Sequence, residues 1–250
     1  MPQALPHTPR RRAAAVARTP PRVRAVLWDL DGTLTDSVRF VVDTANRVIE
    51  AHGGTALDHE MIGGMTGLPL DEIFRIAWPD LSPGDATRYR DEYRALYERD
   101  AIPATRLFRG ARATLHSFHR AGLLQATVTG KRAADCERIL RGLRVMHEIE
   151  VYLGGDSVAR PKPAPDLALA ATLRLGVRPE ESVVVGDAPA DIEMGRAAGA
   201  RTIQVGWGWA RTRLEGAELL VSTWPELRRA VFALARREQP ILRRRGPVRS

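Results

Sequence analysis

The stretch VLWDLDGTLTDS, residues 26–37, places two carboxylates directly after an apolar run. Residues 26–28 have the character of a buried strand, and Asp29 and Asp31 follow at once. Two carboxylates about 5 Å apart repel each other by roughly 3 kcal/mol at an effective dielectric constant near 20. Because folding gains nothing from such a pair, either a cation lies beside the acids or one of them is kept protonated for chemistry.

Two simpler explanations of this stretch concern its turn. An aspartate-rich turn is the commoner case when such a sequence stands alone. A calcium loop of the EF-hand type is excluded, because counting from Asp29 puts Leu34 and Phe40 at loop positions 6 and 12, where glycine and glutamate are required. The role of the two acids therefore has to be inferred from the rest of the sequence.

From about residue 105 onward, apolar runs alternate with segments of helical periodicity. The strand-like runs are LLQATVT, EIEVYLGG, ESVVVGD, ARTIQVG and AELLVS. This alternation predicts an α/β fold built on a doubly wound parallel sheet. Residues 38–104 carry helical signals without a strand, with Ser37 and Ser82 as expected N-caps, and are predicted to form an all-helical insert.

Polar residues collect where the predicted strands end. In a doubly wound sheet, ligands bind beyond the carboxyl ends of the strands. Four acids, two lysines and a hydroxyl at that edge suit a hard divalent cation with oxygen ligands next to a phosphate, the usual setting for Mg²⁺. The residues concerned are Asp29, Asp31, Thr129, Gly130, Lys131, Lys162, Asp187 and Asp191.

Lysine usage singles out two of these positions. The chain holds 38 basic residues, of which only Lys131 and Lys162 are lysines. Lysine is a compact point charge that meets a phosphoryl oxygen without the planar fork of arginine. Lys162 also lies in RPKPAP, a segment that its prolines stiffen.

The motifs DLDGTLTDS, VTGK, RPKPAPD and GDAPADIEMGRAAG, in this order, resemble the four motifs of the haloacid dehalogenase (HAD) superfamily. The resemblance covers roughly residues 23–230. It implies a Rossmann-like catalytic core of residues 22–37 and 105–236, interrupted by a helical C1-type cap of residues 38–104. GLPL in the insert and QVGWGW near the end resemble phosphoglycolate phosphatases and their pyrophosphatase and phosphosugar relatives.

The resemblance implies a role for each catalytic position. Asp29 would be the nucleophile that forms an aspartyl-phosphate, and Asp31 the general acid that later activates water. Thr129, the amide of Gly130 and Lys162 would bind the phosphoryl oxygens. Gly130 departs from the Asn or Ser of many relatives, and Lys131 is a candidate to compensate.

The resemblance also implies a metal site and a substrate lid. Mg²⁺ would be held by Asp29, the backbone carbonyl of Asp31, Asp187 and Asp191. Within residues 61–70, MIGGMTGLPL offers no arginine where many relatives place one near the substrate, which weakens an assignment to glycolate. Its glycines are consistent with a flexible lid segment.

The net charge of +8 is concentrated at the ends of the chain. Residues 1–24 contribute +6 and residues 236–250 contribute +5, which leaves −3 for residues 25–235. The tails, residues 1–21 and 237–250, have the composition of disordered basic segments. They could hold polyanions non-specifically, although solvated tails are the simpler explanation.

Composition also bears on location. No apolar run approaches the ~18 residues of a membrane span, and no apolar signal-peptide region follows the N-terminus. The single cysteine, Cys136, cannot make an internal disulfide, which fits a reducing compartment. A cytoplasmic protein without a membrane partner is therefore expected.

The sequence thus predicts a Mg²⁺-dependent phosphatase that hydrolyses a small, phosphoglycolate-like phosphomonoester. A pyrophosphatase and a phosphosugar phosphatase or mutase are alternatives within the same superfamily. A non-catalytic adaptor that binds polyanions through its tails is the alternative from another class. The expected partner is a small phosphorylated metabolite rather than a specific nucleic acid, and the expected state is a monomer or homodimer.

Overall fold

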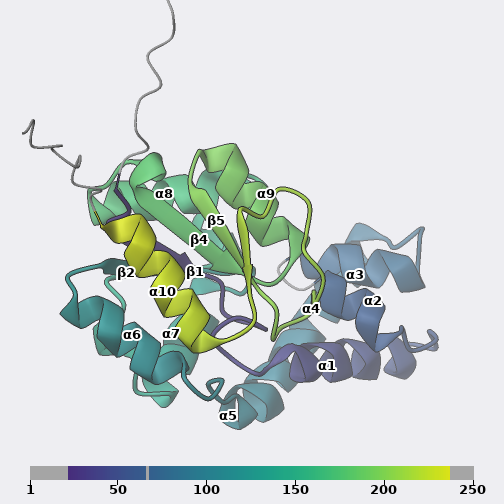
Figure 1. Ribbon diagram of the computed structural model, residues 1–250. Coiled ribbons are helices and arrows are strands. Elements are labelled where there is room, and N and C mark those ends of the chain that lie inside the picture. The colour runs from purple at the N-terminus through teal and green to yellow at the C-terminus, as the bar shows by residue number, and fades with distance from the viewer. Residues whose placement is uncertain (1–21, 66–67, 237–250) are drawn as a thin grey trace, which may run out of the picture.

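The computed structural model describes residues 22–65 and 68–236 (Figure 1). The two predicted disordered tails lie outside the described residues. Thr66 and Gly67, in the middle of the predicted lid segment, also lie outside them. Among the helices that are described, none is long and apolar enough to cross a membrane.

Within the described residues, six parallel strands form one sheet in the order β3-β2-β1-β4-β5-β6. This confirms the predicted doubly wound α/β fold. The strands are β1 (Ala25–Trp28), β2 (Leu124–Val128), β3 (Val151–Leu153), β4 (Ser182–Gly186), β5 (Arg201–Val205) and β6 (Leu219–Val221). The run EIEVYLGG was predicted as a strand throughout, yet only its middle is extended, because a 3₁₀ turn at Met146–Glu148 precedes it.

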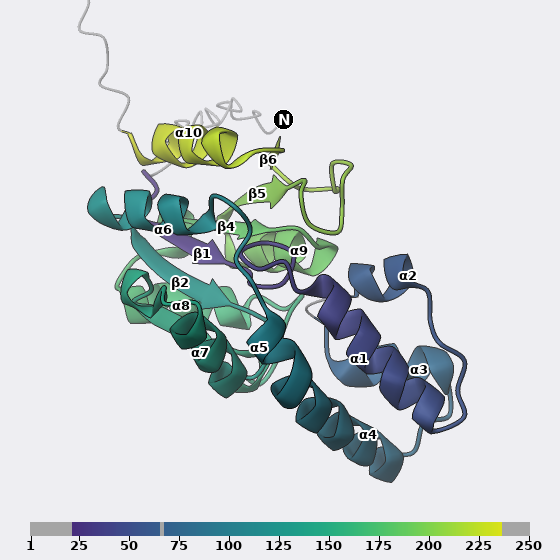
Figure 2. The same ribbon diagram turned by 90° about the horizontal axis from the view of Figure 1, so that it is seen from below.

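Helices cover both faces of the sheet (Figures 1 and 2). One layer consists of α6 (Ala111–Arg120), α7 (Ala133–Gly142) and α10 (Trp224–Ala235), and the other of α8 (Asp166–Leu175) and α9 (Pro189–Ala198). Short 3₁₀ turns at Gly155–Ser157 and Pro179–Glu181 connect elements of this core.

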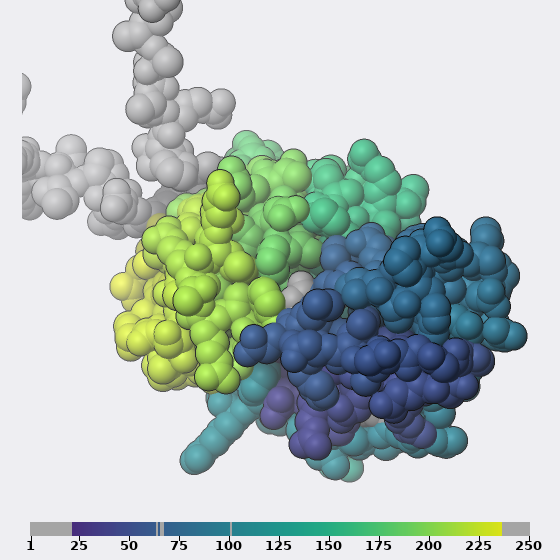
Figure 3. Space-filling model, turned by 90° about the vertical axis from the view of Figure 1, so that its right-hand side faces the viewer, coloured from purple at the N-terminus to yellow at the C-terminus, as the bar shows by residue number. Residues whose placement is uncertain are grey.

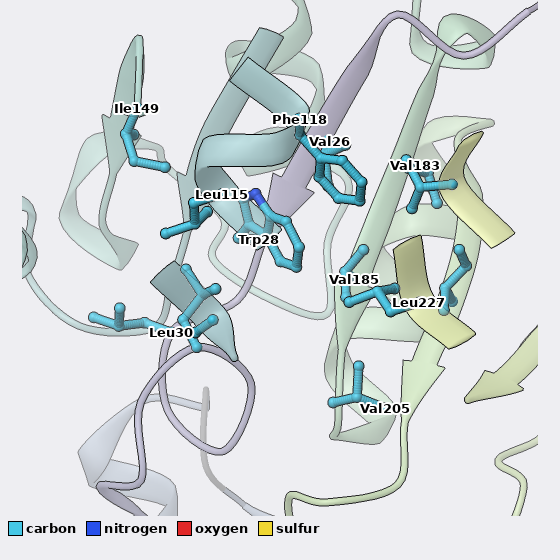
Figure 4. Packing of buried hydrophobic residues seen from close by; sticks show 14 of the residues in the cluster. Val26, Trp28, Leu30, Leu115, Phe118, Ile149, Val183, Val185, Val205 and Leu227 are labelled. Carbon is cyan, nitrogen blue, oxygen red and sulfur yellow. The ribbon is translucent and has the colours of Figure 1, made fainter. Parts of the chain in front are cut away.

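The strands β1 and β4 supply both layers with apolar side chains, as expected for a parallel sheet buried on its two faces. Val26 and Trp28 of β1 point into the layer of α6, α7 and α10, where Trp28 stacks on Phe118 at 5.9 Å (Figure 4). Leu27 points the other way, toward α8 and α9. The acids that follow β1 are therefore held by a strand anchored on both faces.

Among the described residues of 38–104, the regular elements are all helices, and they build a second apolar cluster of their own. These helices lie beyond the carboxyl ends of the strands, where the arrowheads point (Figure 2). They are α1 (Val38–Ala51), α2 (His59–Gly64), α3 (Leu70–Ala77), α4 (Pro83–Leu96), a π-helical turn (Tyr97–Ala101) and α5 (Ile102–Ala104).

The two chain segments that join the helical insert to the core run side by side. Asp36 donates its backbone N–H to Arg106 at 2.9 Å, and Phe108 donates to Leu34 at 3.0 Å. Thr35 forms a β-bridge with Leu107 and another with Asp31. The outgoing and returning chains are therefore tied to each other directly beside the first motif.

Of the two predicted N-caps, one caps its helix through its side chain and the other does not. Ser82 caps α4 as predicted, since its Oγ accepts the N–H of Asp85 at 3.1 Å. Ser37 occupies the N-cap position of α1, but the prediction that its side chain caps the helix was wrong. Its hydroxyl instead donates to Oδ1 of Asp31. Ser37 thus serves the site rather than the helix.

Candidate active site

The site lies where the direction of strand order reverses. β1 pairs with both β2 and β4, and the register puts Trp28 level with Thr127 on one side and Val185 on the other. The carboxyl ends of these central strands therefore meet at the switch point of the sheet, where doubly wound folds bind ligands. The segments that follow them carry Asp29, Thr129 and Asp187.

Three buried carboxylates meet at this point. Asp29, Asp187 and Asp191 can each place an oxygen within 4.8 Å of the others. Lys162 enters from the proline-rich segment after β3, and its Nζ donates to Asp29 at 2.6 Å and to Asp191 at 2.5 Å. Three carboxylates and one ammonium leave a net charge of −2, which one divalent cation would balance.

The pKa shifts reflect this excess of negative charge. Burial raises the pKa of Asp29 well above its ordinary value, although Lys162 opposes the shift. Burial and then the neighbouring Asp191 raise the pKa of Asp187 to about 7. Burial lowers the pKa of Lys162, but the two carboxylates outweigh it and the net shift is upward.

The surroundings of Asp187 fix the orientation of its carboxylate. Thr33 donates its hydroxyl to Oδ1 at 2.8 Å, and the backbone N–H of Trp209 donates to Oδ2 at 2.7 Å. Gly32 and Gly208 line the same carboxylate so closely that an added Cβ at either position would lie 2.3 Å from Oδ2. Gly32 also has a φ of +77°, which favours glycine.

These observations fit a hard divalent cation. The donors are oxygens of buried, oriented carboxylates, the ligand type that Mg²⁺ and Ca²⁺ prefer. Burial first, and then the neighbouring carboxylates, raise the pKa values of Asp29 and Asp187, and a divalent cation bound here would favour their ionised forms. Asp29, Asp187 and Asp191 are thus the side chains that would hold the ion.

Asp31 lies in a different environment from Asp29. Its Oδ1 accepts the hydroxyl of Ser37, and its Oδ2 lies 2.9 Å from Nζ of Lys131. Lys131 also donates to the hydroxyl of Tyr97 at 2.6 Å, and Tyr97 belongs to the π-helical turn near the end of the helical insert. Each motif acid therefore has its own lysine: Lys162 for Asp29 and Lys131 for Asp31.

A cavity of about 360 Å³ opens between the core and the helical insert. Asp31, Gly130 and Lys131 line its core side. Its other walls come from α1, α3, α4 and the segment before α3, which belong to the part of the surface that Figure 3 shows in blue beside the green part of the core. Asp31 thus lies in the core wall of this cavity, whereas Asp29, two residues earlier, is not one of the residues that line it.

The structure brings the predicted residues to this one edge. Asp29, Asp31, Asp187, Asp191 and Lys162 are buried there, and Thr129 is buried at the end of the neighbouring β2. Gly130 lines the cavity beside them. Lys131, suggested as a substitute contact to phosphate, is instead paired with Asp31.

Four contributors were not predicted as site residues: Thr33, Ser37, Tyr97 and Trp209. Ser37 and Thr33 lie inside the first motif, where a spacing pattern gives no sign of which hydroxyl turns inward. Tyr97 and Trp209 reach the site only through tertiary packing. The scarcity of lysine and the position of Lys131 just after a predicted strand had both pointed to that residue.

Comparison with known proteins identifies relatives of this architecture. The sequence profile of the haloacid dehalogenase-like hydrolases matches residues 26–205. A phosphoglycolate phosphatase of Xylella fastidiosa (strain Temecula1) is 33% identical over 186 residues, which cover 74% of this chain and 81% of that protein. An N-acetylmuramic acid 6-phosphate phosphatase of Pseudomonas putida is 30% identical over 217 residues, covering 84% and 96% of the two chains.

Solved structures with the same architecture were also found. A Bacteroides fragilis protein assigned to the haloacid dehalogenase-like hydrolases superposes with a TM-score of 0.77 at 27% identity, covering 82% of this chain and all of that one. A CbbY variant from Rhodobacter sphaeroides, solved with xylulose-1,5-bisphosphate, gives a TM-score of 0.70 at 24% identity and covers 82% and 96%. This second likeness concerns the fold.

Proposed function

Because this chain belongs to the haloacid dehalogenase-like hydrolase family, we propose that its buried acid cluster hydrolyses a small phosphomonoester through a phosphorylated aspartate. The chain is a phosphatase of that family, related to phosphoglycolate phosphatases and to phosphatases of phosphorylated amino sugars. The substrate class, the metal and the residue roles are the parts that we propose.

We assign the metal as Mg²⁺, held by Asp29, Asp187 and Asp191 together with the backbone carbonyl of Asp31. When bound, Mg²⁺ would offset the negative charge of the acids and polarise a phosphoryl oxygen. The net charge of −2 among the three carboxylates and Lys162 supports a divalent ion.

The residue roles follow from the two lysine pairs. Asp29 is assigned as the nucleophile that attacks phosphorus, with Lys162 beside it to hold a phosphoryl oxygen. Asp31 is assigned as the acid that protonates the leaving oxygen and then takes a proton from the attacking water. Thr129 and the amide of Gly130 supply further donors to the phosphoryl group.

One observation carries this proposal: Asp29 and Asp31 are two residues apart, yet they face different partners. Asp29 faces the acid cluster and Lys162, whereas Asp31 faces the cavity and Lys131. Two carboxylates in distinct environments can perform the two different tasks of nucleophile and proton donor. A purely structural acid pair has no need of this separation.

We further propose that residues 38–104 act as the substrate cap and that residues 22–37 and 105–236 form the catalytic core. The cavity between the two supports this division. A cytoplasmic location is proposed as well, since Cys136 is buried and free. The polyanion-binding alternative concerns the tails, outside the described residues, and we do not propose it.

The test is phosphate release from a panel of metabolite monoesters and pyrophosphate, with Mg²⁺ or with excess EDTA. Asp29→Asn should lower kcat by at least about 10³-fold, because an amide is a poor nucleophile toward phosphorus. Circular dichroism and the melting temperature provide the folding control. Unchanged turnover by this variant, or full activity in EDTA, would contradict the proposal.

A further inference from the structure

We infer that the substrate's leaving group is an uncharged, hydroxyl-bearing group of about hexose size, rather than a short carboxylic acid. This inference rests on the proposed phosphatase function and specifies which phosphomonoester the same site takes. It comes from the charges and the surface of the cavity beyond the acid cluster.

The cavity is large for a two-carbon substrate. Its volume of about 360 Å³ lies within the range of roughly 300–1,000 Å³ found for sites that bury ligands of many atoms. It extends from Asp31 and Gly130 in the core to Leu70 and Ile73 of α3. The space beyond the phosphoryl position therefore suits a group with a substantial body.

The cations that line this space are each paired with a carboxylate of the protein. Arg90 holds both oxygens of Asp71 through Nη1, at 2.7 and 2.6 Å, and its Nη2 donates to Thr87 at 3.0 Å. Lys131 is paired with Asp31 at 2.9 Å. In this part of the wall the positive charges are already neutralised.

The remaining arginines of the wall follow the same pattern. Arg132 contacts both oxygens of Asp135, at 2.9 and 3.0 Å, and also donates to Glu98. Arg94 is paired with Asp91 at 3.1 Å. A second anionic group on the substrate would therefore have to displace an existing pair or enter without compensation, and a buried charge without a partner is costly.

The rest of the wall is apolar or aromatic. Val41, Leu70 and Ile73 line it, together with Tyr93 and Tyr97, whose rings stack at 5.6 Å. Such a surface gains from covering the carbon skeleton of a ligand.

Hydroxyl groups are the polar groups of a ligand that this wall can still bind through hydrogen bonds. An ionised carboxylate accepts about four hydrogen bonds, so Asp71, which is paired with Arg90, retains acceptor capacity. A hydroxyl can donate to such an oxygen without bringing a charge into the cavity. An uncharged polyol therefore satisfies the apolar surface and the ion pairs at once.

The experiment compares substrates that differ only in charge. Sorbitol 6-phosphate and 6-phosphogluconate are open chains that end in CH₂OH or in a carboxylate, and 2-hydroxyethyl phosphate and phosphoglycolate form the corresponding two-carbon pair. We expect kcat/KM to favour the neutral member of each pair by about tenfold or more, and sorbitol 6-phosphate to exceed 2-hydroxyethyl phosphate. A carboxylate member that is hydrolysed as well as its neutral partner, or better, would overturn the inference.

Two variants move the preference in opposite directions. Asp71→Asn releases the charge of Arg90 and should raise activity on 6-phosphogluconate relative to sorbitol 6-phosphate by about fivefold. Arg90→Gln leaves Asp71 unpaired and should lower that ratio. Both activities are measured on the same preparation of each variant. Misfolded, inactive protein lowers the two activities by the same factor and so does not change their ratio.

Asp85→Asn is the matched control, since it breaks an exposed pair with Arg88 on the same helical insert, outside the cavity wall. Its ratio should equal that of the unmodified chain. Equal ratios in all four proteins would overturn the inference. Absence of phosphate release from any ester, p-nitrophenyl phosphate included, would instead overturn the proposed function.

Discussion

At the scale of single residues, the site depends on which lysine faces which acid. Lys162 lies between Asp29 and Asp191 inside the acid cluster, and Lys131 joins Asp31 to Tyr97 at the edge of the cavity. Burial disfavours a charged lysine, yet the pKa of Lys131 is raised well above its usual value because Asp31 and the two tyrosines near it outweigh burial. Both ammonium groups therefore stay charged at neutral pH.

Asp31→Asn tests the division of labour between the two acids. The variant should hydrolyse alkyl phosphates at least about 10²-fold more slowly, because the leaving alkoxide needs a proton. It should lose much less on p-nitrophenyl phosphate, whose leaving group departs without one. Initial rates on both substrates under saturating Mg²⁺ measure the difference, and equal losses on the two would argue against the acid role.

At the scale of elements, a loop after β5 is one of the places where the core contacts the helical insert. Trp209 donates its indole N–H to the carbonyl of Glu60 in α2 at 2.7 Å. Gly63 of the same helix lies against this indole so closely that an added Cβ would be 2.5 Å from it. The backbone N–H of Trp209 meanwhile orients Asp187, so the residue links the insert to the acid cluster.

Trp209→Phe removes this indole donor and keeps an aromatic ring. The loss of one hydrogen bond, worth ~1 kcal/mol, should raise KM about fivefold for a substrate that fills the cavity, while kcat changes little. Steady-state kinetics measure the two parameters separately. Trp78→Phe, which alters an aromatic contact with Tyr89 inside the insert, should instead lower stability and leave KM unchanged.

The elements also show which features of the fold and the site could be predicted from the sequence. Strands that end just before Asp29 and Asp187 were predictable, because buried parallel strands are apolar on both faces and stop at a polar residue. The direction of the Ser37 hydroxyl was not, since an N-cap position looks the same whichever partner the hydroxyl takes. The contact between Trp209 and Glu60 could not be predicted either, because it joins segments that are far apart in the sequence.

At the scale of the whole molecule, the acid cluster should make stability depend on pH and metal together. Burial and the neighbouring Asp191 raise the pKa of Asp187 to about 7 in the folded chain, well above the ordinary value of an aspartate. Between these values the folded state holds this proton more tightly than the unfolded state, so the contribution to stability is present below about pH 4 and is lost as the pH rises through 7. A bound divalent cation removes this penalty, because it favours the ionised carboxylate.

In excess EDTA the protein should therefore melt at a lower temperature at pH 8 than at pH 5.5. For a chain of this size each kcal/mol corresponds to about 2–4 °C. Adding Mg²⁺ should raise the melting temperature more at pH 8 than at pH 5.5. Asp187→Asn should flatten the EDTA profile. A melting temperature in EDTA that rises from pH 5.5 to pH 8 would contradict the raised pKa of Asp187.

The paired linkers beside the first motif have a consequence for how such a molecule diversifies. The ties between them, from Asp36 to Arg106 and from Phe108 to Leu34, involve backbone atoms alone. Any amino acid with an N–H and a carbonyl can form these ties, so they place no demand on the sequence of what they carry. The segment between them can therefore diverge in sequence, and substrate choice with it, as long as its contacts with the site, from Tyr97 to Lys131 and from Glu60 to Trp209, are kept.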